Sequence, residues 1–345
     1  MNKARNGLIL LLAILTVLTG ILTVPADSAA DSIPKQYQKA LQYAKDNQPM
    51  EMDIGNVRLK PRQLLEIRNA LPEGAVLKFS TSWAGTCLEW NSTEIDLNKA
   101  TGSIAAEDLN AMMELVPTLK KVNSRKLRNV SNSKIIPLIE KYPDVEFTWL
   151  ICLGPNHYVP SDATAYSTMN RNNGGYRLKT EELEPLKYAK GLKALDLGHN
   201  EISNLEWLRQ FPDMEFLILA INKIDDLSII GELKHLQYLE IFLNDIEDIT
   251  PLINCQELLD LNISQTKVSD ISVLYEIPSL QRLWANATKL TEEQIQEFGE
   301  KRPDVATRFI DRDSTRHGWR QHERYKHYIW CLRHYTWIPF DQPLP

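Results

Sequence analysis

The sequence predicts an α/β solenoid, a curved stack of coils with parallel strands on its concave face and short helical or extended segments on its convex face. Three observations predict this fold. Leucines recur every 22 residues over five consecutive registers, at Leu195, Leu217, Leu239, Leu261 and Leu283. A second apolar column lies two residues further along. Each register then ends in a polar residue that is followed by an aliphatic one. A fixed period of this length indicates stacked supersecondary units.

The polar column explains how each strand ends. Its members are Asn200, Asn222, Asn244, Thr266 and Thr288. The chain must turn away from a parallel sheet at these points, which buries backbone amide groups, and a buried unpaired group costs about 1–3 kcal/mol. An Asn side chain both donates and accepts hydrogen bonds, whereas a Thr offers only a hydroxyl. We therefore expect a hydrogen-bonded ladder that weakens toward the last two coils.

The region before the repeats, residues 31–155, alternates helices and strands at longer spacing. Helical spacing occurs at residues 37–48 and 61–71, and helix–strand pairs are expected within 107–123 and 131–154. Junctions such as YPDVEF and FPDMEF place a proline after the helix and an acid before the strand, which stops the helix. We expect long, irregular repeats that belong to the same curved sheet. A separate N-terminal domain is the alternative.

The remaining segments flank the five repeats, which occupy residues 191–290. Residues 156–190 are rich in turn formers and have little apolar periodicity, so we expect a loop or insertion there. Residues 291–345 give a final helix and strand, then an aromatic and His-rich tail. Because a solenoid must cover its last coil, we expect this tail to form a C-terminal cap.

Residues 1–30 have the pattern of a signal peptide. Lys3 and Arg5 precede an uncharged run over residues 8–24, and small residues follow up to Ala30. This pattern predicts cleavage after Ala30. An uncleaved anchor is the alternative, because the run is at the low edge of the length that spans a bilayer. We expect a secreted protein or one at the extracytoplasmic envelope surface, with membrane contact only through this segment if it is retained.

Charge and motifs narrow the function classes. The repeats from Leu192 to Leu290 hold 16 Asp and Glu against 7 Lys and Arg, and such a block repels phosphate backbones, so nucleic acid is not an expected partner. The chain has no nucleophile elbow, glycine-rich phosphate loop or zinc-protease helix motif. We predict no enzyme activity, no cofactor and no metal. His327, Cys331 and His334 have the spacing of one helix face, and zinc binding there is the alternative to packing in the cap.

The concave face carries the predicted site. Residues that flank the two strand leucines point to this face, and its middle is apolar and aromatic. Contiguous apolar surface marks an interaction site, and Tyr, Trp and Arg are the usual anchors of binding. The expected ligand-binding residues are Phe216, Ile218, Tyr238, Glu240, Phe242, Asp260, Arg282 and Trp284. The alternative is that the loop or the C-terminal tail folds over this face and buries it.

The repeat motif, LxxLxLxxNxI over residues 192–290, resembles the 22-residue leucine-rich repeats of internalin-type bacterial surface proteins. The wider chain, from YPDVEFTW to HGWRQHERYKHY, resembles exported bacterial leucine-rich-repeat proteins. The resemblance implies recognition rather than catalysis. The chain departs from internalins in its long N-terminal units and in lacking a recognisable wall anchor, so adhesion to host cells is not implied.

The predicted function is therefore that of a secreted or cell-envelope binding protein. Its expected partner is a protein or peptide, because the patch mixes large apolar groups with charged ones, and a glycan is the alternative ligand. Two other functions remain open at this stage. One is a structural envelope component whose concave face is covered, and the other is a metal-dependent hydrolase that uses the C-terminal tail.

Overall fold

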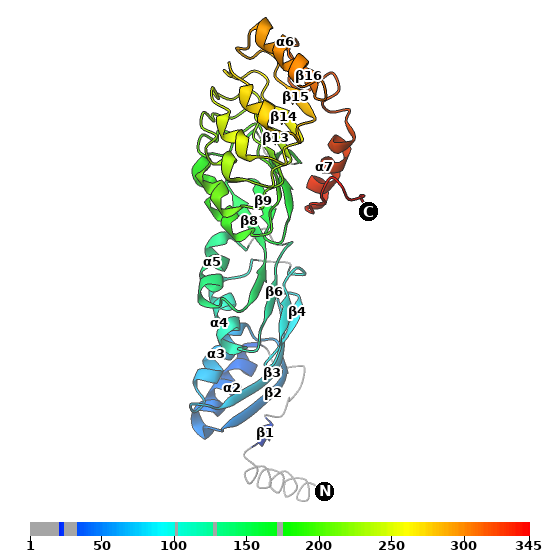
Figure 1. The fold of residues 1–345 in the computed structure, drawn as a ribbon. Helices are drawn as coiled ribbons and strands as arrows, with labels where there is room; N and C mark the ends of the chain where they lie inside the picture. Colours follow the sequence, from blue (N-terminus) through cyan, green and yellow to red (C-terminus); the bar gives the residue numbers. More distant parts are fainter. Residues whose placement is uncertain (1–20, 24–32, 101–102, 127–129, 171–174) are drawn as a thin grey trace, which may run out of the picture. The chain divides into compact units, whose positions relative to one another are not determined.

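The computed structural model describes residues 21–23, 33–100, 103–126, 130–170 and 175–345. They divide into two compact units, one ending at Leu150 and the other beginning at Ile151 (Figure 1). Most of the predicted signal peptide, residues 1–30, lies outside the described residues. None of the helices in the described ranges is long and apolar enough to cross a membrane.

The first unit alternates helices and strands, as its sequence predicts. Its helices are α2 (Ile33–Asn47), α3 (Pro61–Asn69), α4 (Ala106–Leu115) and α5 (Asn132–Lys141). Its strands are β1 (Ile21–Thr23), β2 (Glu51–Val57), β3 (Val76–Trp83), β4 (Thr86–Glu89), β5 (Glu94–Asp96), β6 (Lys121–Asn123) and β7 (Glu146–Thr148). Helix α3 begins at Pro61, because the fixed φ and missing N–H of proline suit the first turn.

The sheets of this unit differ from the expected single curved sheet. Strands β1 to β4 form one sheet and β5 to β7 another, and within the described residues neither continues into the sheet of the repeats. The break between the first two sheets lies at a hairpin: Ala84 and Gly85, with φ of 52° and 76°, turn the chain back so that β4 pairs antiparallel with β3. Strand β4 thus takes the edge position that a parallel coil would need. The expectation of one continuous sheet from residue 50 is wrong.

The second unit is the solenoid. A short sheet pairs β8 (Leu150–Leu153) with β9 (His157–Pro160). The seven strands of the main parallel sheet are β10 (Ala165–Ser167), β11 (Ala194–Asp196), β12 (Phe216–Ile218), β13 (Tyr238–Glu240), β14 (Asp260–Asn262), β15 (Arg282–Trp284) and β16 (Ala306–Arg308). The connecting helices are η1 (Thr168–Asn170), η2 (Thr180–Tyr188), η3 (Glu206–Gln210), η4 (Ile230–Glu232), η5 (Thr250–Asn254), η6 (Ser272–Glu276) and α6 (Glu292–Lys301).

The leucine columns set the register of this sheet. Strands β11 to β15 pair in parallel with a step of one repeat, so that Leu195 aligns with Leu217 and each later leucine with the next. All five leucines of the column are fully buried. The described part of the segment 156–190 is more ordered than expected, because it contributes β10, in which Tyr166 takes the core position beside Leu195. This strand was not predicted, because it is only three residues long and lies among many turn-forming residues.

The polar column makes the hydrogen bonds that a ladder requires. Asn222 Nδ2 donates to Leu219 O at 2.9 Å in its own coil and to Leu197 O at 3.0 Å in the preceding coil, while its Oδ1 accepts from Ile202 N at 2.9 Å. Asn244 repeats this pattern one coil later. Thr266 Oγ1 donates only within its own coil, to Ile263 O at 2.7 Å. The side-chain hydrogen bonds of the ladder to the preceding coil therefore end where Thr266 replaces Asn.

The turn before each ladder residue is strained. The preceding residues have positive φ, between 53° and 60°, in all five coils: His199, Ile221, Leu243, Gln265 and Ala287. This left-handed region suits Gly and Asn and costs other L-residues about 1–2 kcal/mol. The ladder hydrogen bonds offset this cost.

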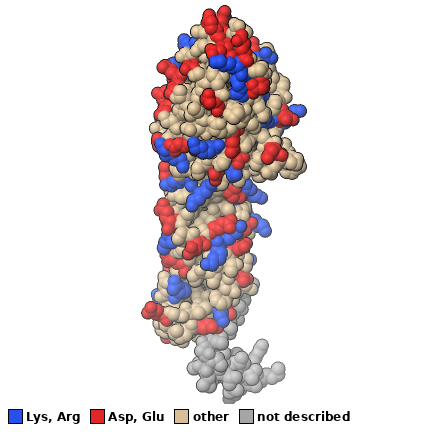
Figure 2. All heavy atoms as spheres, viewed as in Figure 1, with Lys and Arg blue, Asp and Glu red and all other residues tan. Residues whose placement is uncertain are grey.

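Charged side chains on the outer surface pair between neighbouring coils. Lys223 Nζ lies 3.1 Å from Glu201 Oε2, and Lys267 Nζ lies 2.9 Å from Asp245 Oδ1. Figure 2 shows acidic and basic side chains interspersed on the face in view. Exposed pairs of this kind contribute about 0–1 kcal/mol each. These pairs link neighbouring coils.

Candidate binding face

The eight residues predicted to bind a ligand lie together on the concave face of β12 to β15, but they are not open to solvent. Phe216 and Tyr238 have exposed fractions of 0%, and Arg282 and Trp284 of 5%. The other four are buried as well. The expectation of an open face is therefore wrong, and the alternative, burial under the C-terminal tail, is what the structure shows. Whether these residues bind a ligand stays a prediction.

The tail that covers this face is residues 311–344, which we call the cover. It starts over the last coils, where Asn262 Nδ2 donates to Ser314 O at 2.7 Å. It reaches the first strands at Trp337, whose N donates to Thr164 Oγ1 at 2.7 Å. It then turns back, so that the Phe340 ring lies 6.5 Å from Phe216 and 6.3 Å from Tyr238 between centroids. Its middle is helix α7 (Glu323–His334), which lies against β10 and β11 and beside the sheet in Figure 1. The cover thus crosses the whole concave face.

Aromatic rings form the centre of the contact. Phe216 lies 4.6 Å from Tyr328 and 5.5 Å from Trp337, measured between ring centroids. The Trp284 and Trp319 centroids are 5.1 Å apart. Tilted pairs at such distances contribute about 0.5–1.5 kcal/mol beyond the area they bury. The apolar surface of the strands is thus matched by apolar surface of the cover.

Glu240 is the first of three carboxylates that hold the cover. It is 1% exposed, and its Oε1 accepts hydrogen bonds from the Tyr238 hydroxyl and from Trp319 Nε1, the latter at 2.7 Å. Burial raises the pKa of Glu240, although these two donors act in the opposite direction. Burial also raises the pKa of the neighbouring Asp196, whose Oδ2 accepts from Ser167 Oγ at 2.7 Å.

Asp260 is the second carboxylate. It is fully buried and accepts from Arg282 through both oxygens, at 2.7 and 2.8 Å. Arg324 of α7 adds a third bond, from Nη1 to Oδ1 at 2.8 Å. Bidentate and charge-assisted bonds of this kind are the strong class of protein hydrogen bond. One carboxylate therefore joins a strand to the cover.

Glu215, just before β12, is the third carboxylate. Its Oε1 accepts from Lys193 Nζ at 2.9 Å, and its Oε2 accepts from Trp337 Nε1 of the cover at 2.6 Å. Glu215 is not among the predicted site residues, because it precedes the strand rather than flanking the leucines. Glu240, Asp260 and Arg282, which are predicted to contact a ligand, contact the chain's own tail in this structure.

In-register coils of 22 residues, with buried leucines and an Asn ladder, define the fold. The chain folds as a leucine-rich-repeat solenoid. Among solved structures, it is similar to internalin F of Listeria monocytogenes, with 18% identity over 81% of this chain and 87% of that one and a TM-score of 0.41. It is also similar to internalin C2 of the same species, with 18% identity, 60% and 84% coverage and a TM-score of 0.35.

A third similar structure is a leucine-rich-repeat protein of Leptospira interrogans, with 17% identity, coverage of 75% of this chain and 72% of that one, and a TM-score of 0.37. These likenesses concern the fold alone. No protein-family model and no curated protein matches the chain. The assignment of the fold therefore depends on the repeats themselves.

The tail of this leucine-rich-repeat protein is helical where the zinc alternative requires a helix, but its candidate ligands do not converge. His327 Nε2 bonds to Ile338 O at 2.7 Å, and His334 Nδ1 bonds to Trp330 O at 2.8 Å. Cys331 is buried in the contact with the strands. Among the described residues, no group of three or more His, Cys, Asp and Glu side chains is placed to hold a metal ion.

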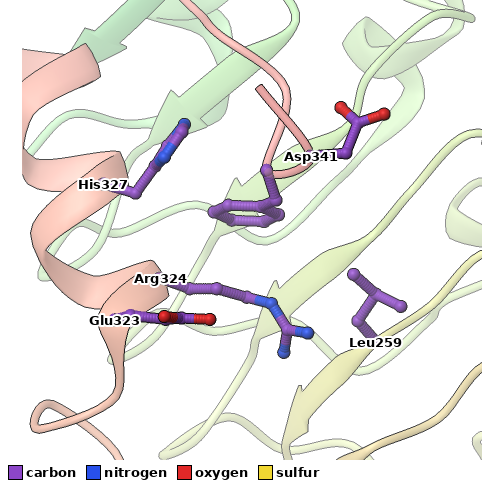
Figure 3. Close-up of a pocket in the computed structure, with 6 residues that line it drawn as sticks. Leu259, Glu323, Arg324, His327 and Asp341 are labelled. Atoms are coloured by element: carbon purple, nitrogen blue, oxygen red, sulfur yellow. The ribbon is translucent and has the colours of Figure 1, made fainter. Parts of the chain in front are cut away.

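A hollow remains at the seam between the cover and the repeats. Figure 3 shows its lining, which comes from α7, from the end of the chain and from the residue before β14: Glu323, Arg324, His327, Phe340, Asp341 and Leu259. Its volume is about 410 Å³. The Arg324 guanidinium carbon lies 5.8 Å from the centroid of the Phe340 ring. The contact between Arg324 and Phe340, both in the cover, therefore borders a solvent-accessible hollow.

Proposed function

We propose that this leucine-rich-repeat protein binds a protein or peptide segment on its concave face, in place of the cover. One observation carries the proposal: the face already holds a peptide segment, residues 311–344, through buried aromatic rings and carboxylates. Buried aromatic and Arg anchors are the groups that dominate binding energy at protein interfaces. The cover is then an internal occupant that a partner displaces.

Charge supports an exchange of this kind. The repeats from Leu192 to Leu290 hold 16 acidic and 7 basic residues, whereas residues 311–345 hold 6 Lys and Arg against 4 Asp and Glu. Complementary charge favours the encounter of the two surfaces and fixes their orientation. An uncovered face would expose a contiguous aromatic patch, which promotes aggregation. The cover protects the face until a partner binds.

The N-terminal segment supports export. Lys3 and Arg5, the apolar run over residues 8–24 and the small residues up to Ala30 favour secretion or placement at the extracytoplasmic envelope surface. The partner is then a protein or peptide of that compartment. A fixed, structural cover is the second candidate function, and the complete burial of Phe216 and Tyr238 favours it.

The test compares three forms of the mature chain from Asp31 onward: wild type, Trp319→Ala and a matched control, Trp90→Ala. Trp319 is fully buried under the cover, whereas Trp90 is 37% exposed in the first unit. Each form is used to capture proteins from envelope and culture-fluid fractions, with and without a synthetic peptide of residues 311–344. Circular dichroism verifies that each form is folded.

We expect Trp319→Ala to capture a partner that wild type and Trp90→Ala capture weakly, and the peptide to displace it. Equal capture by all three forms, unaffected by the peptide, would place the binding site elsewhere. If Trp319→Ala captures no protein and the wild type self-associates, the structural role would be favoured.

A further inference from the structure

We propose, on the basis of the proposed function, that the displacing ligand is an aromatic and basic peptide segment with the pattern Trp-x4-Arg-x3-Tyr. The cover presents this pattern at Trp319, Arg324 and Tyr328. A second indole donor, as in Trp337, completes the match. The concave face selects for these groups through its three buried carboxylates and its aromatic floor.

The three carboxylates share one arrangement. Each has one partner from the repeats, and these are Lys193 for Glu215, Tyr238 for Glu240 and Arg282 for Asp260. Each also has one partner from the cover, and these are Trp337, Trp319 and Arg324 in the same order. The repeats thus present three buried acceptors, one just before β12, one on β13 and one on β14. Each accepts a further bond from the segment that lies on the face.

A ligand without matching donors meets a penalty here. Such a ligand excludes water from the face, so a carboxylate that loses its hydrogen bond to the cover has no water molecule to replace it. The free-energy cost is larger for a charge-assisted hydrogen bond than for a neutral one. An acidic segment would also face the excess negative charge of the repeats. A purely apolar segment would bury the carboxylates without pairing them. Donor-bearing aromatic and basic side chains satisfy both requirements.

The spacing follows from the path of the cover. Trp319 precedes α7 and reaches Glu240 on β13, and Arg324 in the first turn of α7 reaches Asp260 on β14. Tyr328, one turn later, places its ring 4.6 Å from Phe216 and 5.2 Å from Tyr238. Residues three and four apart lie on one face of a helix, so Arg324 and Tyr328 point together to the strands. A ligand needs a helical turn after its Trp.

The test selects ligands without using this chain's tail. A display library of random 16-residue peptides is panned against the full mature chain carrying Trp319→Ala, and selected peptides are measured against the same chain with Glu240→Gln added. In the Trp319→Ala background the indole bond from the cover to Glu240 is absent, so this second change acts on the ligand and on the bond from the Tyr238 hydroxyl. Synthetic peptide 314–338 and its Trp319→Phe form, which keeps a ring but lacks the N–H, serve as defined probes.

We expect enrichment of Trp followed five residues later by Arg, and about tenfold weaker binding to the Glu240→Gln chain, as for one charge-assisted bond. The Trp319→Phe peptide should lose more affinity for the chain that keeps Glu240 than for the Glu240→Gln chain, because the Gln oxygen still accepts a bond from the indole N–H but without the charge. Peptides that bind but lack the pattern, and bind both chains equally, would overturn the ligand class and leave peptide binding intact. Failure of every peptide, including 314–338, would overturn the proposed function itself.

Discussion

Replacement of Trp319 by Ala should open the cover while leaving the repeats folded. Trp319 is fully buried, its Nε1 donates to Glu240 at 2.7 Å, and the Arg282 guanidinium carbon lies 4.4 Å from its ring centroid. Truncation of a buried Trp to Ala costs about 3–5 kcal/mol of stability. This range already includes the hydrogen bond that is lost, so no separate contribution is added for it. We take about 4 kcal/mol, which raises the open fraction of the cover about a thousandfold at 1.4 kcal/mol per factor of ten.

Hydrogen exchange measured by mass spectrometry resolves this change segment by segment. Amides in residues 311–344 should exchange up to about a thousandfold faster in Trp319→Ala, because exchange from a locally opened state reports the free energy of that opening. Amides of β11 to β15 should change little, since their bonds to neighbouring strands and the buried leucine column remain. The Trp90→Ala control should leave both segments unchanged.

Two outcomes would refute this reasoning. Equal acceleration in the cover and in the strands would show that they unfold as one unit, so that the cover is part of the fold and not an occupant of it. Unchanged exchange in residues 311–344 would show that Trp319 does not anchor the cover. In either case the ligand would have to bind another surface.

Three further predictions concern the solenoid and its buried acid. Asn244→Thr should lower the free energy of unfolding by about 2 kcal/mol in urea titration, because it removes the bonds to Leu219 O and from Ile224 N in the preceding coil. Leu243→Asn should raise the free energy of unfolding by about 0.5 kcal/mol, and with it the melting temperature, because Leu243 has φ of 54°, a conformation that Asn tolerates better. Burial raises the pKa of Glu240 above its ordinary value of 4.5, so the folded protein binds this proton more tightly than the unfolded chain does. The resulting stability is present below pH 4.5 and is lost as the pH rises through the pKa of the folded protein. Glu240→Gln should therefore lose less stability than wild type as the pH rises above 4.5, and an equal loss in both proteins would contradict this assignment.

The repeats were predictable from the sequence because their contacts are periodic. Leu195 and Leu217 align in space since they are one repeat apart in the chain, and the same step fixes every strand from β11 to β15. The weakening of the ladder after Asn244 was also predictable, because it depends only on the donors and acceptors of Asn and Thr. Local chemistry and a fixed period were sufficient for this part of the fold.

The state of the concave face was not predictable from the sequence. Phe216 and Tyr238 suit an open binding surface and a buried contact equally well, because both uses require the same apolar rings. The contacts that decide between them join residues far apart in the chain, such as Trp319 with Glu240 and Trp337 with Glu215, which are 79 and 122 positions apart. No period relates these residues. For the same reason, the tail was expected at the end of the last coil and lies instead along the concave face.

The tether between the cover and the repeats sets a requirement on any ligand. A segment attached through a short linker competes at an effective concentration of about millimolar, so a free ligand with the same contacts would displace it only near that concentration. The apparent dissociation constant equals the intrinsic one divided by the fraction of open protein. A change that opens the cover by some factor must therefore tighten ligand binding by the same factor, until the open form predominates. Measured on Trp319→Ala, the acceleration of exchange in residues 311–344 and the gain in affinity for one selected peptide should agree. If exchange accelerates and affinity does not, the peptide binds outside the face that the cover occupies.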